Sequence, residues 1–401
     1  MELKHYYALL RFALGFTQLT EEDEQWLKQV DWTDALQFAQ KQSLVGVMFE
    51  GIKRLPQHLS PSRHTLFSWI VQVQAIERQS RLLNLATTTV YQRLKQLNVA
   101  CCILKGQGNA LSYQNPLSRT PGDIDVWVTG RFQEGNNTPT EGGKHQVLRE
   151  LSREELRAVA KALAQGHGNI GHESINHIEM TVDGIAVELH PTPTVLNSPL
   201  HNRRLQRWVR HQAEAQSANM VTLPEYKTPV AIPTREFNLI YQLSHLYHHH
   251  LFEGIGLRQF VDYALLLKRK EEGEKRREKT QSANTSSLTT VRPHPITSTL
   301  KALNLMGFAG AVMYVLQEVF GLTEEEMIVP VDPKRGRLLL ADILQGGNFG
   351  YYDDSFTHNA LGHNLQRIRR DVRLMRYYPA ETLSEPFFRI WHYFWRRSQK
   401  K

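Results

Sequence analysis

Two aspartates one residue apart on an apolar stretch are the residues of this sequence best suited to chemistry. They are Asp123 and Asp125, in the segment Gly122-Asp-Ile-Asp-Val-Trp-Val128. Side chains alternate across a β-strand, so the two carboxylates share one face while the aliphatic residues beside them face a core. Adjacent acids on such a strand repel each other and lose hydration. A divalent cation relieves both costs, and Mg²⁺ prefers carboxylate and phosphate oxygens, so the pair predicts a metal-dependent transfer of a phosphorus group.

A turn with a basic residue precedes the acidic strand. Residues 99–104 read as a short buried strand, Lys105 and Gly106 begin a turn, and a short helix is expected at 109–113. A turn that leads into a helix N-terminus can bind phosphate, and Lys105 adds a positive charge there. Arg119, just before the acidic strand, is a candidate to bind phosphate or to orient a carboxylate.

The register of a predicted hairpin places a third acid. Asp183-Gly184 between two alternating runs is a strong signal for a two-residue hairpin turn. Pairing the runs about this turn gives one apolar face and one polar face. Glu179 and Glu188 then stand opposite each other on the polar face. Glu188, close to the end of its strand, is the candidate third metal ligand, and Glu179 is the alternative.

These segments resemble a known family. The resemblance rests on Leu-Lys-Gly at 104–106, Arg119-x-Pro-Gly-Asp-Ile-Asp125, Val-Glu-Leu-His190, and His248-His-His250 followed by Glu253-Gly-Ile-Gly-Leu-Arg-Gln259 and Asp262. Together they look like the polymerase-β-type nucleotidyltransferase superfamily, and more closely like its uncharacterised bacterial branch. The similarity extends over roughly residues 60–395.

The resemblance implies an activity and a cofactor set. In the superfamily three acids bind two metal ions and a nucleoside triphosphate (NTP) donates a nucleotidyl group, so Asp123, Asp125 and Glu188 would take those positions with Mg²⁺. Lys105-Gly106 stands where the superfamily usually has Gly-Ser. The same departure is found in nucleotidyltransferase-like toxins of abortive-infection and toxin–antitoxin systems. It leaves the NTP, the way it binds and the acceptor open.

Basic side chains after the hairpin are further candidates. His245, His248 and His249 lie at i, i+3 and i+4 and share one face of a predicted helix. They either contact substrate or phosphate, with His249 as the preferred contact, or form a polar helix face; a metal site there is disfavoured because no acid at clear ligand spacing completes it. Arg258, at the start of the next helix, either pairs with Asp262 or holds the triphosphate.

The pattern predicts an α+β protein in three regions. They are an N-terminal helical region (1–95), a nucleotidyltransferase core with a small mixed sheet (96–232), and a C-terminal helical bundle (233–401). One long or broken helix is expected at 61–97, capped by Ser60. Two or three shorter helices are expected before it, and further helices at 236–250, 256–270, 297–320, 335–345, 361–376 and 384–397. Segments 130–144 and 271–295 read as insertions, the second of them disordered.

Three local patterns complete this division. A capping box at Ser152 begins a helix after the first insertion. The aromatic residues of the last helix, at helical spacing, are expected to dock that helix on the core. Trp127, on the same face as the aspartates, either stacks on a base or shields the edge of the sheet.

Composition bounds the remaining choices. The chain has 401 residues, 41% hydrophobic and 22% charged, with a net charge of +8. It has no apolar run long enough for a membrane helix, so no membrane partner is expected. Cys101 and Cys102 are adjacent on a strand and point to opposite faces, which favours packing roles and a cytoplasmic location. The net charge permits an RNA partner, but basic runs mixed with glutamates favour a solvated surface.

The predicted function is therefore Mg²⁺-dependent transfer of a nucleoside monophosphate from an NTP. The acceptor is left open among a small molecule, a protein side chain and an RNA end. One alternative is a nucleotide-sugar glycosyltransferase that uses Asp-x-Asp, but this would need a sugar-nucleotide domain before the motif. The other is a non-catalytic binding module that has kept the fold and the acids.

Overall fold

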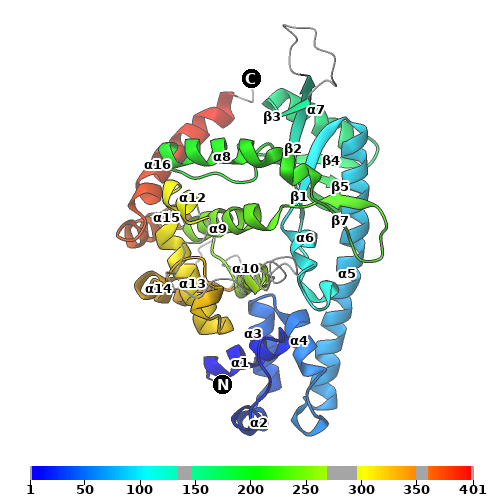
Figure 1. Ribbon diagram of the computed structural model, residues 1–401, viewed down its shortest axis with the longest axis vertical. Helices are drawn as coiled ribbons and strands as arrows, with labels where there is room; N and C mark the ends of the chain where they lie inside the picture. The colour runs from blue at the N-terminus through cyan, green and yellow to red at the C-terminus, as the bar shows by residue number, and fades with distance from the viewer. Residues whose placement is uncertain (1, 134–145, 269–295, 349–359, 399–401) are drawn as a thin grey trace, which may run out of the picture.

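The computed structural model describes residues 2–133, 146–268, 296–348 and 360–398 (Figure 1). It is an α+β protein, as predicted, with one mixed six-stranded sheet and many helices. In Figure 1 the long helix α5 (Arg63–Gln96) runs beside the sheet, and the C-terminal helices lie on the opposite side of the view. Within the described ranges, no helix is both long and apolar enough to cross a membrane.

The sheet is built around the acidic strand. Its strands are β1 (Val99–Leu104), β2 (Ile124–Gln133), β3 (Gln146–Glu150), β4 (Gly168–Glu173), β5 (Ile178–Val182) and β6 (Ile185–His190). Their order is β1-β2-β6-β5-β4, and β3 pairs with the far part of β2. Only the pair of β2 and β6 is parallel among these described strands. The sheet therefore brings the start of β2 beside the end of β6.

One strand was missed in the sequence. The expected loop at 130–144 begins too early, because β2 continues to Gln133 and pairs with β3. The remaining part of that segment lies outside the described residues, as does the predicted disordered insertion at 271–295. Helix α7 (Arg153–Ala164) follows β3, with the predicted capping box at Ser152.

The hairpin of β5 and β6 has the predicted register. Met180 pairs with Val187, and Glu179 pairs with Glu188. Asp183 and Gly184 both have positive φ, at 49° and 80°. Two consecutive positive φ values are typical of the type I′ turn, whose twist matches that of the flanking strands. This turn fixes the register, and with it the face on which each acid lies.

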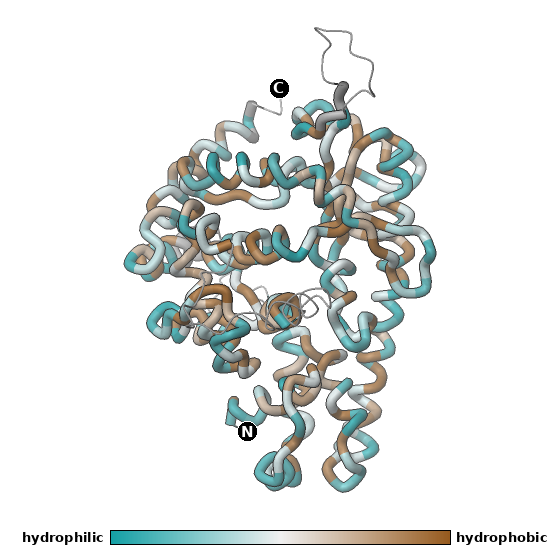
Figure 2. The backbone as a smooth tube through the Cα atoms, viewed as in Figure 1, coloured by the Kyte–Doolittle hydropathy of each residue, from teal (hydrophilic) through white to brown (hydrophobic). Residues whose placement is uncertain are grey.

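Helices cover both faces of the sheet. Apolar residues of α5 and α7 form one core with residues of β1, β2, β5 and β6, including Ile124 and Val126. The opposite face of β1 and β2, including Cys102 and Trp127, packs in a second core with α8 (Pro199–Ala218) and α9 (Arg235–Phe252). In Figure 2 the central strands and α9 carry long brown stretches, which is the pattern of elements buried on several sides. Both cysteines are buried in β1, and burial raises the pKa of Cys101 to about 12.

The N-terminal region has four α-helices before α5, not two or three. They are α1 (Leu3–Ala13), α2 (Glu21–Leu27), α3 (Trp32–Lys41) and α4 (Val45–Ile52). Helix α5 is continuous, but its N-cap is Ser62, which accepts a hydrogen bond from the backbone N–H of Thr65. Ser60 ends a short 3₁₀ helix, Gln57–Leu59, and is not the cap.

The described C-terminal helices follow the predicted order with one break. They are α9, α10 (Leu257–Lys268), α12 (Thr297–Ala302), α13 (Met306–Phe320), α14 (Pro333–Gly346), α15 (Ala360–Met375) and α16 (Pro379–Ser398). The helix expected at 297–320 is divided because Asn304 takes a left-handed conformation, with φ of 59°. Helices α9, α10, α12, α13, α14 and α15 share one apolar core with the N-terminal helices, and Arg11 donates a hydrogen bond to the carbonyl of Val319.

Of the five aromatic residues expected to dock α16, three are exposed, whereas Phe388 and Trp395 are half-buried and the Trp395 ring contacts the Arg153 guanidinium. Phe387 is 76% exposed, Phe394 is 62% exposed and Trp391 is half exposed. Instead, the helix is held at its start by Glu381, whose carboxylate accepts hydrogen bonds from the backbone N–H groups of Asn197 and Ser198. The spacing of the aromatic residues correctly predicted a helix with an apolar face. Spacing alone does not show whether other residues of the protein cover that face.

Candidate active site

Three carboxylates converge where β2 begins and β6 ends. Asp123 is the residue before β2, Asp125 is its second residue, and Glu188 is the register partner of Asp125 on β6. One carboxylate oxygen from each lies within 4.8 Å of the others. Asp125 is only 2% exposed, so its charge has little water to screen it. Three oxygen donors this close together, partly withdrawn from water, fit a divalent cation.

The Lys105–Gly106 turn lies against this acidic cluster. Lys105 Nζ is 3.0 Å from Asp125 Oδ2. Burial would lower the pKa of Lys105, but the negative charges of Asp125, Asp123 and Glu188 outweigh it and raise that pKa. Lys105 and Gly106 have φ values of 39° and 49°, so the chain reverses direction in a conformation that side chains other than glycine rarely adopt. The turn therefore aims a permanent cation at the carboxylates.

The helix after this turn differs from the prediction. It is α6 (Gly106–Ala110), which starts at the turn itself and is only five residues long. A helix this short has a small dipole, so the phosphate-binding capacity of the turn depends chiefly on the charge of Lys105. A Cβ atom added at Gly106 would lie 3.7 Å from the carbonyl oxygen of Asp123. The turn and the acidic strand are thus direct neighbours.

Two histidines beside the acids were missed as site residues in the sequence. His190 Nε2 lies 3.0 Å from Asp125 Oδ1 and 3.2 Å from Glu188 Oε2. His177 Nδ1 lies 3.5 Å from Glu188 Oε2, and its Nε2 lies 3.2 Å from Glu179 Oε1. The sequence did contain a pattern that could have identified them, because the hairpin register puts both imidazoles on the polar face that carries the two glutamates.

These contacts set the protonation of the site. Burial would lower the pKa of His190, but hydrogen bonds to Asp125 and Glu188 outweigh burial and raise it to about 9. Burial would raise the pKa of Glu188, but the hydrogen bond from His190 and its charge lower it. The imidazolium of His190 and the ammonium of Lys105 thus offset part of the negative charge of the three acids.

A cavity of about 680 Å³ opens beside this cluster. Asp123, Lys105 and Glu188 line one side of it, together with the histidines of the hairpin. This volume is in the range of small-molecule sites, which is about 300–1,000 Å³. The acids, the cation and the space for a ligand therefore occur together.

Helix α9 supplies the facing wall. His245, His248 and His249 all line the cavity, as their shared helical face predicts. His249 Nε2 is 3.0 Å from His245 Nε2, and His249 Nδ1 is 2.8 Å from Glu253 Oε2. His250 points away from the cavity and is fully buried beside Phe308. Among the described residues, the groups spaced to hold a metal do not include the α9 histidines.

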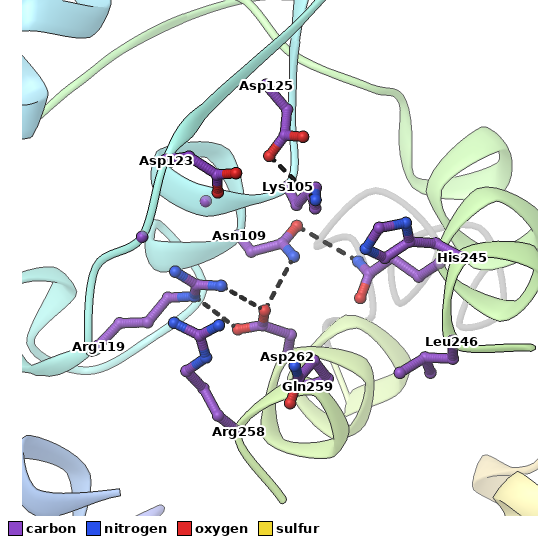
Figure 3. A pocket seen from close by; sticks show the side chains of 13 residues that line it. Lys105, Asn109, Arg119, Asp123, Asp125, His245, Leu246, Arg258, Gln259 and Asp262 are labelled. Carbon is purple, nitrogen blue, oxygen red and sulfur yellow. Dashed lines mark hydrogen bonds and ion pairs between the residues drawn. The ribbon is translucent and has the colours of Figure 1, made fainter. Parts of the chain in front are cut away.

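A smaller pocket below the aspartates contains the two arginines (Figure 3). Arg119 Nε and Nη2 donate to the two oxygens of Asp262, at 2.9 and 2.8 Å. Tyr113 and Asn109 donate to the same carboxylate. Arg119 is therefore ion-paired with a carboxylate that belongs to α10.

Arg258 lies next to this network. Its Nη1 donates to the carbonyl of Thr120, at 2.9 Å, and its side chain also lines the large cavity. Burial and the neighbouring Arg119 lower the pKa of Arg258 to about 10. Arg258 is thus placed at the edge of both pockets, close to the segment that leads into Asp123.

Other side chains cover the ring of Trp127. This residue is only 4% exposed, its ring stacks on Phe237 at a centroid distance of 5.7 Å, and its Nε1 donates to the carbonyl of Pro191. A ring covered in this way cannot stack on a base, so Trp127 shields the sheet.

Comparison with known proteins bears on this site. The family of uncharacterised nucleotidyltransferases matches residues 28–135 and 149–290, which include β1, the acidic strand, the hairpin and the α9 histidines. No curated protein matches the chain. One solved structure, of an antigenic nucleotidyltransferase-like protein from Paracoccidioides brasiliensis, is similar over 55% of this chain and 92% of its own length, at 15% identity. Its TM-score is 0.29, too low to establish a shared fold. The family match covers more than half of the sequence, and the chain belongs to this family of nucleotidyltransferases.

Proposed function

We propose that this protein transfers a nucleoside monophosphate from an NTP to an acceptor hydroxyl or amine, with Mg²⁺ at the acidic cluster. One observation carries the proposal: the carboxylates of Asp123, Asp125 and Glu188 come together, and Asp123 and Glu188 line a cavity large enough for a nucleotide. Membership of a nucleotidyltransferase family supports the reaction class. The relationship to polymerase-β-type enzymes is part of the proposal.

The donor set of the cluster fits magnesium. All three ligands are carboxylates, which are the side chains that Mg²⁺ prefers, and the cavity leaves room for phosphate oxygens to complete its coordination. Bound Mg²⁺ would neutralise charge on the triphosphate and on the displaced pyrophosphate. Asp123, Asp125 and Glu188 are the residues that would hold it.

The chain's own cations position the donor. Lys105 lines the cavity, and its Nζ is paired with Asp125. A metal ion bound by Asp125 would replace Lys105 in this pair, and Lys105 Nζ could then pair with phosphate oxygens. Arg258 lines the same cavity on the side of Asp123, and His249 lines its far wall. Transfer of a phosphorus group requires mainly such positioning and charge stabilisation. We assign Lys105, Gly106, Arg258 and His249 to the NTP, and Arg119 to holding the Asp262 carboxylate beside them.

The two alternatives make different demands. A glycosyltransferase would need a sugar-nucleotide domain before Asp-x-Asp, whereas every element from Leu3 to Gln96 is helical. A binding module would hold an NTP without turning it over. The acceptor stays open among a small molecule, a protein side chain and an RNA end.

Calorimetric titration of ATP, CTP, GTP and UTP, with and without Mg²⁺, tests the donor site. Metal-dependent binding of at least one NTP is expected, and Asp123→Asn should abolish it. Asp183→Asn, at the far turn of the hairpin, is the matched control and should bind normally. Binding that is independent of Mg²⁺, or unaffected by Asp123→Asn, would contradict the proposal.

A further inference from the structure

Two imidazole nitrogens lie beside the carboxylate of Glu188, and one of them, His190 Nε2, also lies 3.0 Å from Asp125 Oδ1. His177 and His190 each bring an imidazole nitrogen to the same carboxylate oxygen, Oε2, at 3.5 and 3.2 Å. The three donor atoms all lie within 4.8 Å of one another. Zinc–ligand bonds of about 2.0–2.2 Å in a tetrahedral arrangement place neighbouring ligand atoms about 3.3–3.6 Å apart. The two distances to Glu188 match this spacing.

A carboxylate supports one of the two imidazoles from behind. His177 faces Glu188 with Nδ1, and its other nitrogen, Nε2, lies 3.2 Å from Glu179 Oε1. Metal-bound histidines usually donate their second ring N–H to a carboxylate or carbonyl, which fixes the tautomer and leaves the first nitrogen free to bind the metal. Glu179 is therefore placed to hold His177 in the form that a cation needs.

We propose that His177, Glu188 and His190 form a second cation site, which takes a transition-metal ion such as Zn²⁺. Imidazole nitrogen suits zinc and similar ions, whereas Mg²⁺ favours oxygen ligands. Glu188 belongs both to this group and to the carboxylate cluster, so the two cation sites would be adjacent. This cation site is inferred from the geometry of the hairpin, and the inference does not depend on whether the protein transfers nucleotides.

The open side of this ligand set faces the large cavity. His177, Glu188 and His190 all line that cavity. Three protein ligands with a fourth position open to a ligand are the pattern of catalytic zinc sites, whereas structural zinc sites have four protein ligands. The second ion would therefore be in contact with whatever occupies the cavity, beside the ion held by Asp123 and Asp125.

Cobalt provides a direct readout, because four-coordinate Co²⁺ absorbs visible light and six-coordinate Co²⁺ absorbs it weakly. Chelator-treated protein is titrated with Co²⁺ in an excess of Mg²⁺. The site predicts one Co²⁺ per chain with a strong visible band that Zn²⁺ displaces. His177→Ala should remove the band, and Glu179→Gln should weaken Co²⁺ binding about 10–100-fold, as loss of an outer-shell partner does.

Two controls separate this site from others on the chain. His167→Ala removes an exposed imidazole that lies 3.1 Å from Asp183 at the far end of the hairpin, and the band should persist. Asp123→Asn should also keep the band while it removes Mg²⁺-dependent NTP binding, so failure of the metal proposal and failure of the proposed function are distinguishable. If His177→Ala does not fold, His177→Gln keeps a hydrogen-bonding side chain and serves in its place.

A wild-type protein without the visible band would overturn the proposal. So would a band of full strength in a folded His177→Ala or His177→Gln variant, because the imidazoles would then only form hydrogen bonds with the two glutamates.

Discussion

Asp125 and Glu188 are register partners in the parallel pair of β2 and β6. This pairing brings Glu188 to the two aspartates, because β6 lies between β2 and β5 in the sheet and its hairpin turn connects it only to β5. The hairpin turn at Asp183 decides that Glu188 lies on the polar face. The parallel contact with β2 then decides which glutamate of that face reaches the aspartates.

This relationship ranks the two glutamates. Glu188→Gln should weaken Mg²⁺-dependent NTP binding by more than about 100-fold, because it removes a ligand charge from the cluster. Glu179→Gln should weaken this NTP binding less, because Glu179 contacts His177 and its side chain is about half exposed. Titration calorimetry of both variants with the same NTP checks the order. Equal losses, or a larger loss in Glu179→Gln, would exclude Glu188 as the third ligand.

The turn at Lys105 combines a charge with a strained backbone. Its φ of 39° and ψ of −143° are costly for a residue with a Cβ atom. Lys105→Gly and Lys105→Ala both remove the charge, and both should weaken NTP binding. The glycine variant should have the higher free energy of unfolding, by about 1 kcal/mol, because only alanine keeps the strain. Urea unfolding of the two variants measures the difference, and equal stability would mean that Lys105 is unstrained.

Breaking the buried pair of Arg119 and Asp262 should be strongly destabilising, because it leaves one buried charge without a partner. Asp262→Asn leaves the Arg119 guanidinium without its counter-charge, at a cost of about 3–5 kcal/mol in the free energy of unfolding. Glu225→Gln is a matched control, because its ion pair with Arg81 is exposed and should cost at most about 1 kcal/mol. Urea denaturation compares the two, and a similar small loss in both would show that α10 does not depend on this pair.

Glu381 should make stability depend on pH. Burial raises its pKa to about 7 from an ordinary value of 4.5, although the backbone N–H groups of Asn197 and Ser198 act in the opposite direction. Between these two pH values the folded protein binds more protons than the unfolded chain, so the free energy of unfolding falls as pH rises through that window.

Glu381→Gln removes this titration and keeps an oxygen for both N–H groups. The variant should lose less stability than the wild type between about pH 4.5 and 7, by at most about 3 kcal/mol. Thermal or urea unfolding across that range measures it. A slope with pH that is the same in both proteins would show that Glu381 ionises normally.

Local patterns account for the parts that the sequence predicted well. Asp183-Gly184 sets a hairpin register by turn chemistry alone, and the alternation of Asp123 and Asp125 correctly predicts that their carboxylates lie close together. Long-range pairing accounts for what was missed. Strand β3 is defined by its pairing with β2, and that pairing cannot be seen in the residues of β3 alone. In the same way, no local pattern links Arg119, which precedes β2, to Asp262 on α10.

The histidines show the same limit in another form. His177 and His190 were visible on the polar face, but their importance depends on how near they come to Glu188. The spacing of the aromatic residues in α16 predicted the helix correctly but not the exposure of Phe387, Trp391 and Phe394. Helical spacing marks an apolar face but does not show what covers it.

Nucleotidyl transfer is tested most directly by following the two ends of the NTP donor. The protein is incubated with Mg²⁺ and an NTP labelled at the α-phosphate or at the γ-phosphate, together with separate pools of small molecules, proteins and RNA. Transfer predicts that the α-label moves to one pool and that the γ-label leaves as pyrophosphate, both lost in Asp123→Asn. Transfer of the γ-label, or release of pyrophosphate that Asp123→Asn leaves unchanged, would contradict the account.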